Sequence, residues 1–174
     1  MSQPFEVRRA GVRDSAVIAR HRAEMFTDMG ELPPRLYGEL VAATMRYLEE
    51  AIPAEDYVAW LAAPRENPLE IVAGAGLQRR RILPRAARAG ETRILKGRQG
   101  IVLNVFTERA WRRRGLAELL MREVLSWAGE AGLDDLVLHA SADGRRLYER
   151  LGFAATNEMR YKGRLGEPSL KPLP

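Results

Sequence analysis

The sequence predicts a mixed α/β fold, with a sheet that carries helices on both faces. Short apolar or alternating runs typical of strands are interspersed with longer segments of helix-forming residues. The chain has 174 residues, 46% of them hydrophobic, which is enough for one domain with its own core. It contains no internal repeat and no linker. We therefore expect a single domain over residues 1–162 and an irregular tail over 163–174, where Pro and Gly are frequent.

Residues that favour helix caps and turns separate the expected elements. Asp14 is placed to cap the first helix, and Gly30 with the Pro33-Pro34 pair separates it from the second. Strands are expected at 5–10, 57–61, 71–77, 101–106, 136–139, 153–155 and 158–161, and helices at 15–25, 35–50, 116–128 and 143–150. Gly152 stands where a helix C-cap favours glycine. The basic segment 84–100 lacks periodicity, so we expect a long loop there, either solvated or dedicated to binding.

Composition excludes several kinds of chemistry. There is no cysteine, so neither a disulfide framework nor a thiolate nucleophile is available. The two histidines, His21 and His139, show no metal-ligand spacing, and we predict no metal site. The net charge of +5 and a pI near 10.0 favour anionic partners in general. We see neither a signal peptide nor a membrane-spanning run, and expect a cytoplasmic protein without a membrane partner.

The stretch from Ile101 to Leu120 combines a buried strand, a basic turn with Gly115, and a helix. The first N–H groups of a helix have no partner within it, and the helix dipole adds partial positive charge there. Glycine lets an anion approach the backbone closely, and neighbouring arginines raise the local potential. This stretch alone fits either an anion site or an ordinary strand–turn–helix with a solvated turn.

Two motifs in order resemble the GNAT superfamily of N-acetyltransferases. Arg112-x-x-Gly115-x-Ala117 resembles its acyl-CoA pyrophosphate loop, and Leu147-Tyr148-x-x-x-Gly152-Phe153 resembles its second signature. One helix and one strand separate them, as in the family, and the resemblance covers roughly residues 5–161. It implies a mostly antiparallel sheet that is splayed at its centre. It also implies transfer of an acetyl group from acetyl-CoA to a primary amine by direct attack on the thioester.

The resemblance also implies which residues bind the donor. The pantetheine arm would lie along the strand end at Val105, Phe106 and Thr107, where a backbone N–H would polarise the thioester carbonyl. The pyrophosphate would lie on the turn that follows, formed by Arg112, Arg113, Arg114, Gly115, Leu116, Ala117 and Glu118. Ser141 could contact the pantetheine arm or cap the short helix. Tyr148 would protonate the departing thiolate, unless it is simply a core aromatic residue.

The acceptor side is less defined. Glu24, His139, Glu158 or an ordered water could accept the proton of the amine. Asp28, Glu31, Glu24 and Glu158 could form an acidic pocket for a cationic amine, or remain solvated surface carboxylates. A non-catalytic acyl-CoA sensor and a basic nucleic-acid-binding protein are the alternatives. No nucleic-acid-binding motif is recognisable, so we expect no nucleic-acid partner. The sequence leaves open the amine, the acyl-chain preference and whether the chain forms a homodimer.

Overall fold

The computed structural model describes residues 4–87, 92–156 and 158–159. The chain forms two compact units, Met1–His139 and Ala140–Pro174, and each is described by itself. The strands of the first unit are β1 (Phe5–Arg9), β2 (Tyr57–Pro64), β3 (Ala73–Arg81), β4 (Arg85–Ala86), β5 (Ile94–Leu95), β6 (Arg98–Thr107) and β7 (Asp135–Leu138). Its helices are α1 (Ser15–Asp28), α2 (Tyr37–Ala51) and α3 (Leu116–Glu130), with short 3-10 turns at Val12–Asp14, Pro34–Leu36 and Arg109–Trp111.

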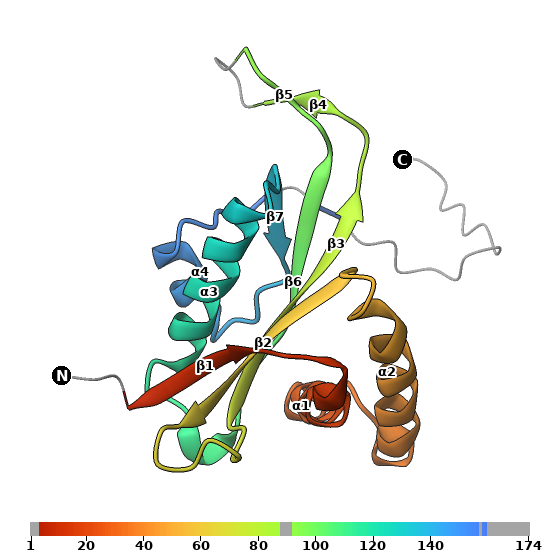
Figure 1. Cartoon of the computed structure of the whole chain (residues 1–174), viewed down its shortest axis with the longest axis vertical. Helices are drawn as coiled ribbons and strands as arrows, with labels where there is room; N and C mark the ends of the chain where they lie inside the picture. The colour runs from red at the N-terminus through yellow and green to blue at the C-terminus, as the bar shows by residue number, and fades with distance from the viewer. Residues whose placement is uncertain (1–3, 88–91, 157, 160–174) are drawn as a thin grey trace, which may run out of the picture. The chain divides into compact units, whose positions relative to one another are not determined.

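Five strands form the main sheet in the order β1-β2-β3-β6-β7 (Figure 1). The β1–β2, β2–β3 and β3–β6 pairs are antiparallel, and the β6–β7 pair is parallel. The parallel pairing ends where Val102 faces Leu138, whereas β6 continues to Thr107. The predicted mixed, mostly antiparallel sheet is confirmed. The pairing of β6 with β7 ends halfway along β6.

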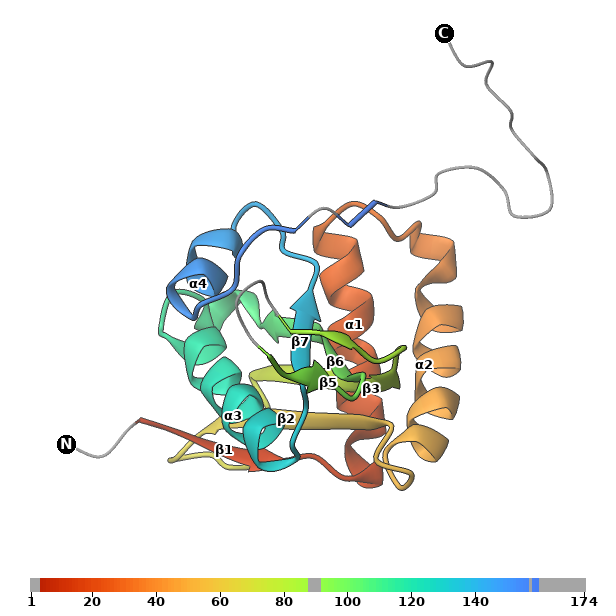
Figure 2. The ribbon, with the colours of Figure 1, turned by 90° about the horizontal axis from the view of Figure 1, so that it is seen from above.

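Helices cover both faces of this sheet, α1 and α2 on one and α3 on the other (Figure 2). Every residue of β2 is buried, because alternate side chains of a strand point to opposite faces and both faces are covered. Tyr57, Ala59 and Leu61 join the cluster that contains Ile18 of α1 and Leu48 of α2. Trp60 points the other way, and its ring meets that of Trp127 of α3 at 5.8 Å.

A bulge interrupts the pairing of β3 with β6. Gly74 faces Phe106 and Gly76 faces Leu103, so β6 has one more residue than β3 between these pairs. Asn104 occupies the bulge with φ +56°, a left-handed conformation that asparagine tolerates better than most residues. Its buried side chain accepts a hydrogen bond from Arg22 Nη1 at 2.6 Å and donates one to the Tyr57 hydroxyl at 2.9 Å. The bulge therefore re-aims the end of β6.

Two expectations in this unit need correction. The segment 84–100 is not a plain loop, because β4 pairs with β5 and β6 already begins at Arg98. Asp14 does stand at the N-cap position of α1, but its carboxylate does not cap that helix. It accepts bonds from Arg8 and from the Gly11 N–H instead. The guanidinium of Arg8 lowers the pKa of Asp14, so the pair replaces the cap.

The second unit contains α4 (Arg145–Arg150), which ends as predicted at Gly152. Gly152 has φ +93°, its N–H donates to Glu149 O, and the Phe153 N–H donates to Tyr148 O. This is the Schellman arrangement, and the Tyr148 and Phe153 rings make its usual apolar contact at 6.1 Å. Residues 153–155 form no strand. The strand expected at 158–161 falls largely, and the tail expected at 163–174 entirely, outside the described residues.

Candidate active site

The end of β6 carries the first group of predicted site residues. Phe106 is buried, whereas Val105 and Thr107 are half-buried on the opposite side of the strand. Phe106 pairs with Gly74 and Thr107 with Ala73 across the β3–β6 ladder, so β3 fixes one edge of this segment. The other edge has lost β7 as a partner after Val102. A strand edge that leaves its neighbour can accept an extended ligand through backbone hydrogen bonds.

The turn after β6 has the backbone conformation of an anion site. Arg113 has φ +64° and Gly115 has φ +82°, so two of three successive residues are left-handed. Gly115 then caps α3, whose first helical bond runs from Leu119 N–H to Gly115 O. The preceding N–H groups, those of Leu116, Ala117 and Glu118, are the ones that helix geometry leaves for a ligand. The predicted strand–turn–helix is thus present.

The three arginines of this turn are not oriented alike. Arg112 donates to Asp28 of α1 and, through Nε, to Thr107 O at 3.0 Å. Arg114 lies 4.8 Å above the Trp111 ring in a cation–π contact. Neither side chain is therefore an unengaged phosphate ligand in this structure. Backbone N–H groups, rather than the guanidinium groups of Arg112 and Arg114, are the anion-binding elements that this turn offers.

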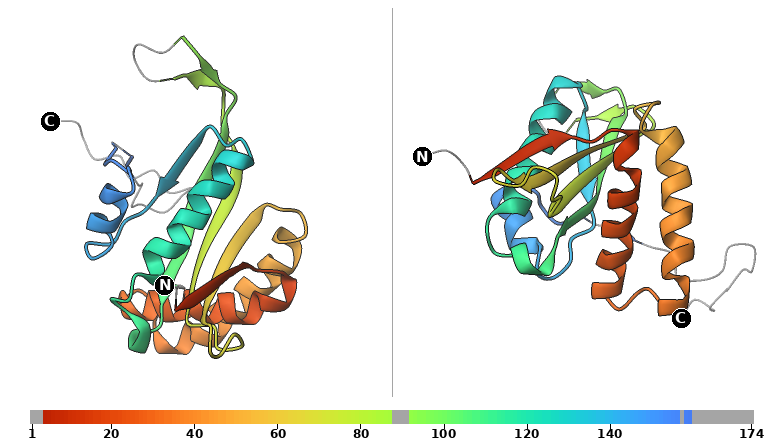
Figure 3. Two further views of the ribbon diagram at one scale, coloured as in Figure 1. Left: turned by 60° about the vertical axis from the view of Figure 1, so that its left-hand side comes forward. Right: turned by 60° about the horizontal axis from the view of Figure 1, so that its bottom comes forward.

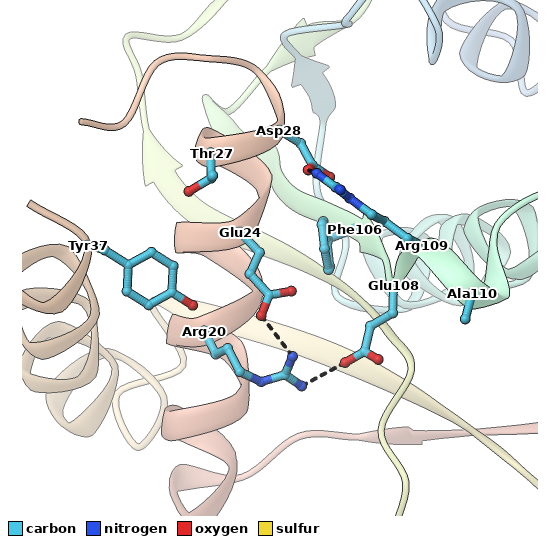
Figure 4. A pocket seen from close by; sticks show the side chains of 9 residues that line it. All are labelled: Arg20, Glu24, Thr27, Asp28, Tyr37, Phe106, Glu108, Arg109 and Ala110. Atoms are coloured by element: carbon cyan, nitrogen blue, oxygen red, sulfur yellow. Dashed lines mark hydrogen bonds and ion pairs between the residues drawn. The ribbon is translucent and has the colours of Figure 1, made fainter. Parts of the chain in front are cut away.

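A cleft of about 440 Å³ opens between α1, the start of α2 and the chain after β6 (Figure 4). Its walls carry acidic, basic and aromatic side chains in close proximity. They come from Arg20, Glu24, Thr27, Asp28, Tyr37, Phe106, Glu108, Arg109 and Ala110. Phe106 contributes to this wall, so the cleft adjoins the end of β6 where the donor thioester is expected.

Arg20 joins two carboxylates of the cleft. Its guanidinium donates to Glu24 Oε1 at 3.1 Å and to Glu108 Oε1 at 2.8 Å (Figure 4). Asp28 receives Arg109 at 2.5 Å as well as Arg112, and these two bonds lower the pKa of Asp28. The carboxylates are thus held in fixed positions by arginines, and the charges of the cleft largely balance.

His21 lies beneath this cluster and is only 2% exposed. Its Nε2 is 3.3 Å from Arg20 Nη2 and 3.5 Å from Glu108 Oε1, and its ring packs 5.1 Å from that of Phe106. Its Nδ1 is buried without a hydrogen-bond partner among the described residues. Burial, and then the charge of Arg20, lower the pKa of His21 to about 4, so the ring is neutral at pH 7.

Only some of the residues predicted for the acceptor side line the cleft. Glu24 and Asp28 do line the cleft, whereas Glu31 does not. His139 is exposed just after β7 and is not among the residues that line the cleft. Glu158 belongs to the second unit. Glu108 lines the cleft but sequence reasoning missed it; its only signal was its position directly after the apolar strand.

Ser141 and Tyr148 lie in the second unit. Ser141 Oγ accepts a bond from Gly144 N–H at 3.2 Å, and its carbonyl accepts one from Arg145 N–H, so Ser141 closes the turn before α4, whose N-cap residue is Gly144. A Cβ at Gly144 would lie 2.9 Å from the Tyr148 ring, so glycine permits the ring to fold back over the turn. Burial raises the pKa of Tyr148, which keeps its hydroxyl protonated at neutral pH.

Over the part of the chain that the structure describes, no group of three or more His, Asp or Glu side chains could hold a metal ion. None of the described helices is long and apolar enough to cross a bilayer.

Comparison with known proteins agrees with this architecture. Residues 85–165 match the model of the acetyltransferase (GNAT) domain. A GCN5-related N-acetyltransferase from Ralstonia eutropha JMP134 is 25% identical, with a TM-score of 0.77 over 90% of this chain and 97% of that one. A predicted acetyltransferase from Clostridium acetobutylicum, solved with acetyl-CoA, is 24% identical, with a TM-score of 0.75 over 91% and 96%.

Glucosamine-6-phosphate N-acetyltransferase from Arabidopsis thaliana shares the fold at 15% identity, with a TM-score of 0.64 over 92% of this chain and 99% of that one. No curated protein sequence matches the chain. The fold, with its strand–turn–helix, is the one these acetyltransferases share. The domain model, over residues 85–165, and the fold both match those of GNAT acetyltransferases.

Proposed function

We propose that the chain transfers an acetyl group from acetyl-CoA to a primary amine by direct attack of the amine on the thioester. The observation that carries this proposal is the course of the chain from β6 to α3. β6 parts from β7 at Val102 and runs directly into a turn with left-handed residues at Arg113 and Gly115. An exposed strand edge followed by a helix N-terminus suits a ligand with an amide-rich arm and a pyrophosphate.

The donor would lie along Val105, Phe106 and Thr107, with its pyrophosphate on the N–H groups of Arg113, Gly115, Leu116, Ala117 and Glu118. The acetyl-CoA bound by the Clostridium acetobutylicum protein, which has the same fold, supports this choice of donor. The carbonyl of Thr107 is already engaged by Arg112, so the strand would contact the donor through its other backbone groups.

The acceptor amine would enter the cleft beside Phe106. Glu24 and Glu108 both face that cleft and are held by Arg20, so either can accept a hydrogen bond from an ammonium group. We assign proton removal to Glu108, because it follows the strand end where the thioester is expected. After proton transfer the amine nitrogen attacks the acetyl carbonyl, the C–S bond breaks, and the CoA thiolate takes a proton. Tyr148, whose raised pKa keeps it protonated, is the proposed donor of that proton.

The test is an amine panel of small amines, peptide N-termini and lysine peptides, followed by CoA release. Because the chain has no cysteine, a thiol reagent detects released CoA without reacting with the protein. We expect turnover on at least one amine class, and a fall in kcat of about 100- to 10,000-fold in Tyr148→Phe. Tight acetyl-CoA binding without turnover on any amine would instead support a non-catalytic sensor.

The variant Glu108→Gln tests whether Glu108 is the base that removes the proton of the amine. Loss of the base should lower kcat at pH 7, and the loss should shrink as rising pH deprotonates the amine in solution. Glu24→Gln is the direct competitor, since it faces the same cleft, and Glu66→Gln is the control for an exposed carboxylate outside it. If Glu24→Gln alone shows the pH-dependent loss, the assignment to Glu108 is wrong.

A further inference from the structure

A cationic arm extends beyond α1, α2 and α3 (Figures 1 and 3). We use this name for residues 79–87 and 92–98, which comprise the end of β3, β4, β5 and the start of β6. The two segments of the arm come together where Ile82 N–H donates to Gly97 O at 2.9 Å. Gly97 has φ +79°, and a Cβ there would lie 1.9 Å from Ile82 O, so this close approach requires glycine. The arm is a built element of the fold.

The basic character of the whole chain resides in this region. Residues 79–98 contain eight of the 28 Lys and Arg residues and only one of the 23 Asp and Glu residues, a net charge of +7. The entire chain has a net charge of +5, so the residues outside 79–98 sum to −2. The high pI therefore reflects a local feature, whereas the part that carries the candidate active site is slightly acidic.

The cations of the arm are exposed and only partly neutralised. They are Arg79, Arg80, Arg81, Arg85, Arg93, Lys96 and Arg98, all exposed. Ion pairs join Arg79 to Glu55 at 3.6 Å, Arg85 to Asp135 at 2.9 Å and Arg98 to Asp134 at 3.7 Å. Arg93 also interacts electrostatically with Asp134. Arg81 and Lys96 have no acidic partner among the described residues. The arm thus presents surplus positive charge to solvent.

The register of the arm places like charges together. Arg81 lies directly opposite Arg98 on the neighbouring antiparallel strand, and Arg79 shares their face because alternate residues point the same way. Like charges at directly opposed positions destabilise a strand pair. Glu55 and Asp134 partly neutralise Arg79 and Arg98, whereas Arg81 has no acidic partner among the described residues. An anion lying along this face would supply the negative charge that Arg81 lacks.

We propose that the cationic arm binds the phosphate backbone of a nucleic acid. Six of its seven described cations are arginine, whose planar guanidinium pairs with phosphate in a bidentate manner. A two-stranded ribbon also has the width that the major groove of B-DNA admits. A specific protein interface would instead need an apolar centre depleted in charge. The arm offers only Leu83 and Ile94 as large exposed apolar residues, at 86% and 64% exposure, with cations on both strands around them.

The experiment measures binding of the full chain to a fluorescein-labelled 20-nucleotide DNA, single-stranded and as a duplex, by anisotropy over a salt series. The test variant is Arg81→Gln/Lys96→Gln, which leaves the three ion pairs of the arm intact. The matched control is Arg13→Gln/Arg46→Gln, which removes two exposed cations outside the arm. Unfolding midpoints of both variants verify that each is folded.

We expect the test variant to lose about 10- to 100-fold in affinity at 0.1 M salt and about 1.4 to 1.8 in the slope of log K against log salt, while the control changes little. Turnover on small amines should be unchanged in both, because the arm lies outside the cleft. Equal losses in test and control would show binding to overall charge only and overturn the proposal. So would absence of binding to either form of DNA, or arm-dependent binding of poly-glutamate alone, which would assign the arm to an acidic protein.

Discussion

Nε2 of His21 lies 3.5 Å from Oε1 of Glu108, a contact between a buried imidazole on α1 and the carboxylate that follows β6. Arg20 touches both groups, with Nη2 3.3 Å from the imidazole and 2.8 Å from the carboxylate. Burial, and then the positive charge of Arg20 beside it, lower the pKa of His21, so the ring is neutral at pH 7. The proposed base, Glu108, therefore contacts a neutral imidazole ring. Protonation of that ring at acidic pH would place a buried charge beneath the site.

The first prediction concerns stability at acidic pH. The pKa of His21 is about 4 in the folded chain and 6.5 in the unfolded one, so between these values only the unfolded state binds the proton. Stability should therefore be unaffected above pH 6.5 and fall by about 3 kcal/mol as pH drops from 6.5 to 4. Urea unfolding at a series of pH values measures this slope. His21→Asn cannot titrate, and should lack the His21 contribution.

Asp14 provides a second titration in a separate pH range. Its pKa is lowered by Arg8, so its contribution is present above the ordinary aspartate pKa and is lost as pH falls below it. Asp14→Asn should therefore leave the loss between pH 6.5 and 4 largely unchanged. An equal slope in wild type and His21→Asn would contradict the assignment of this loss to His21.

The second prediction isolates the backbone conformation of Gly115. A Cβ at Gly115 or at Gly129 meets no atom within 4 Å, but Gly115 has φ +82° whereas Gly129 lies within α3. Gly115→Ala should destabilise the chain by about 1–2 kcal/mol, because a side chain disfavours the left-handed region. Gly129→Ala should instead stabilise it by about 0.5–1 kcal/mol. Similar changes in the two variants, measured by urea unfolding, would rule out conformation as the cause.

The third prediction separates backbone from side-chain contributions to acetyl-CoA binding. Arg112 is committed to Asp28 and Thr107 O, so Arg112→Gln should change the acetyl-CoA Kd by less than about tenfold. Gly115→Val should weaken binding by more than that, since it alters the turn that presents the N–H groups. Titration calorimetry gives both constants. A larger loss in Arg112→Gln than in Gly115→Val would show that the guanidinium leaves Asp28 to bind the phosphate.

The fourth prediction concerns the hydrogen bonds behind the bulge. Burial raises the pKa of Tyr57 to about 12, and its hydroxyl accepts a bond from Asn104 Nδ2 at 2.9 Å. Tyr57→Phe leaves that buried amide without its partner and should cost about 1–3 kcal/mol in the free energy of unfolding. The control is Tyr47→Phe, whose exposed hydroxyl accepts a bond from Gln78 and should matter by less than about 0.5 kcal/mol.

Features whose cause is local could be predicted from the sequence. The α1 and α2 helices, the strand before Gly115, and the helix end at Gly152 all follow from side-chain pattern, glycine conformation and capping within a few residues. The Schellman arrangement gives a physical reason for Tyr148-x-x-x-Gly152-Phe153, because it joins Tyr148 O to Phe153 N–H and brings the two rings together. Asp14 failed as a cap because Arg8, on the neighbouring strand, binds it more favourably.

Features that depend on distant partners were not predictable. β4 and β5 have two residues each and form only because they pair with each other. Strands this short show no periodicity in the sequence. Glu108 carries no motif, and becomes a candidate base only because Arg20 and His21 of α1 are brought to it. Similarly, Arg112 gave no sequence signal that Asp28 would hold its side chain.

The sequence by itself determined the main helices, the strand, basic turn and helix around Gly115, and the family resemblance, because each depends on residues close together in the chain. Only the tertiary structure decided which acids meet at the cleft, that a neutral His21 lies beneath them, and that the basic segment forms a two-stranded arm. These are consequences of packing between segments some 20 to 90 residues apart, and local patterns contain no information on such distances.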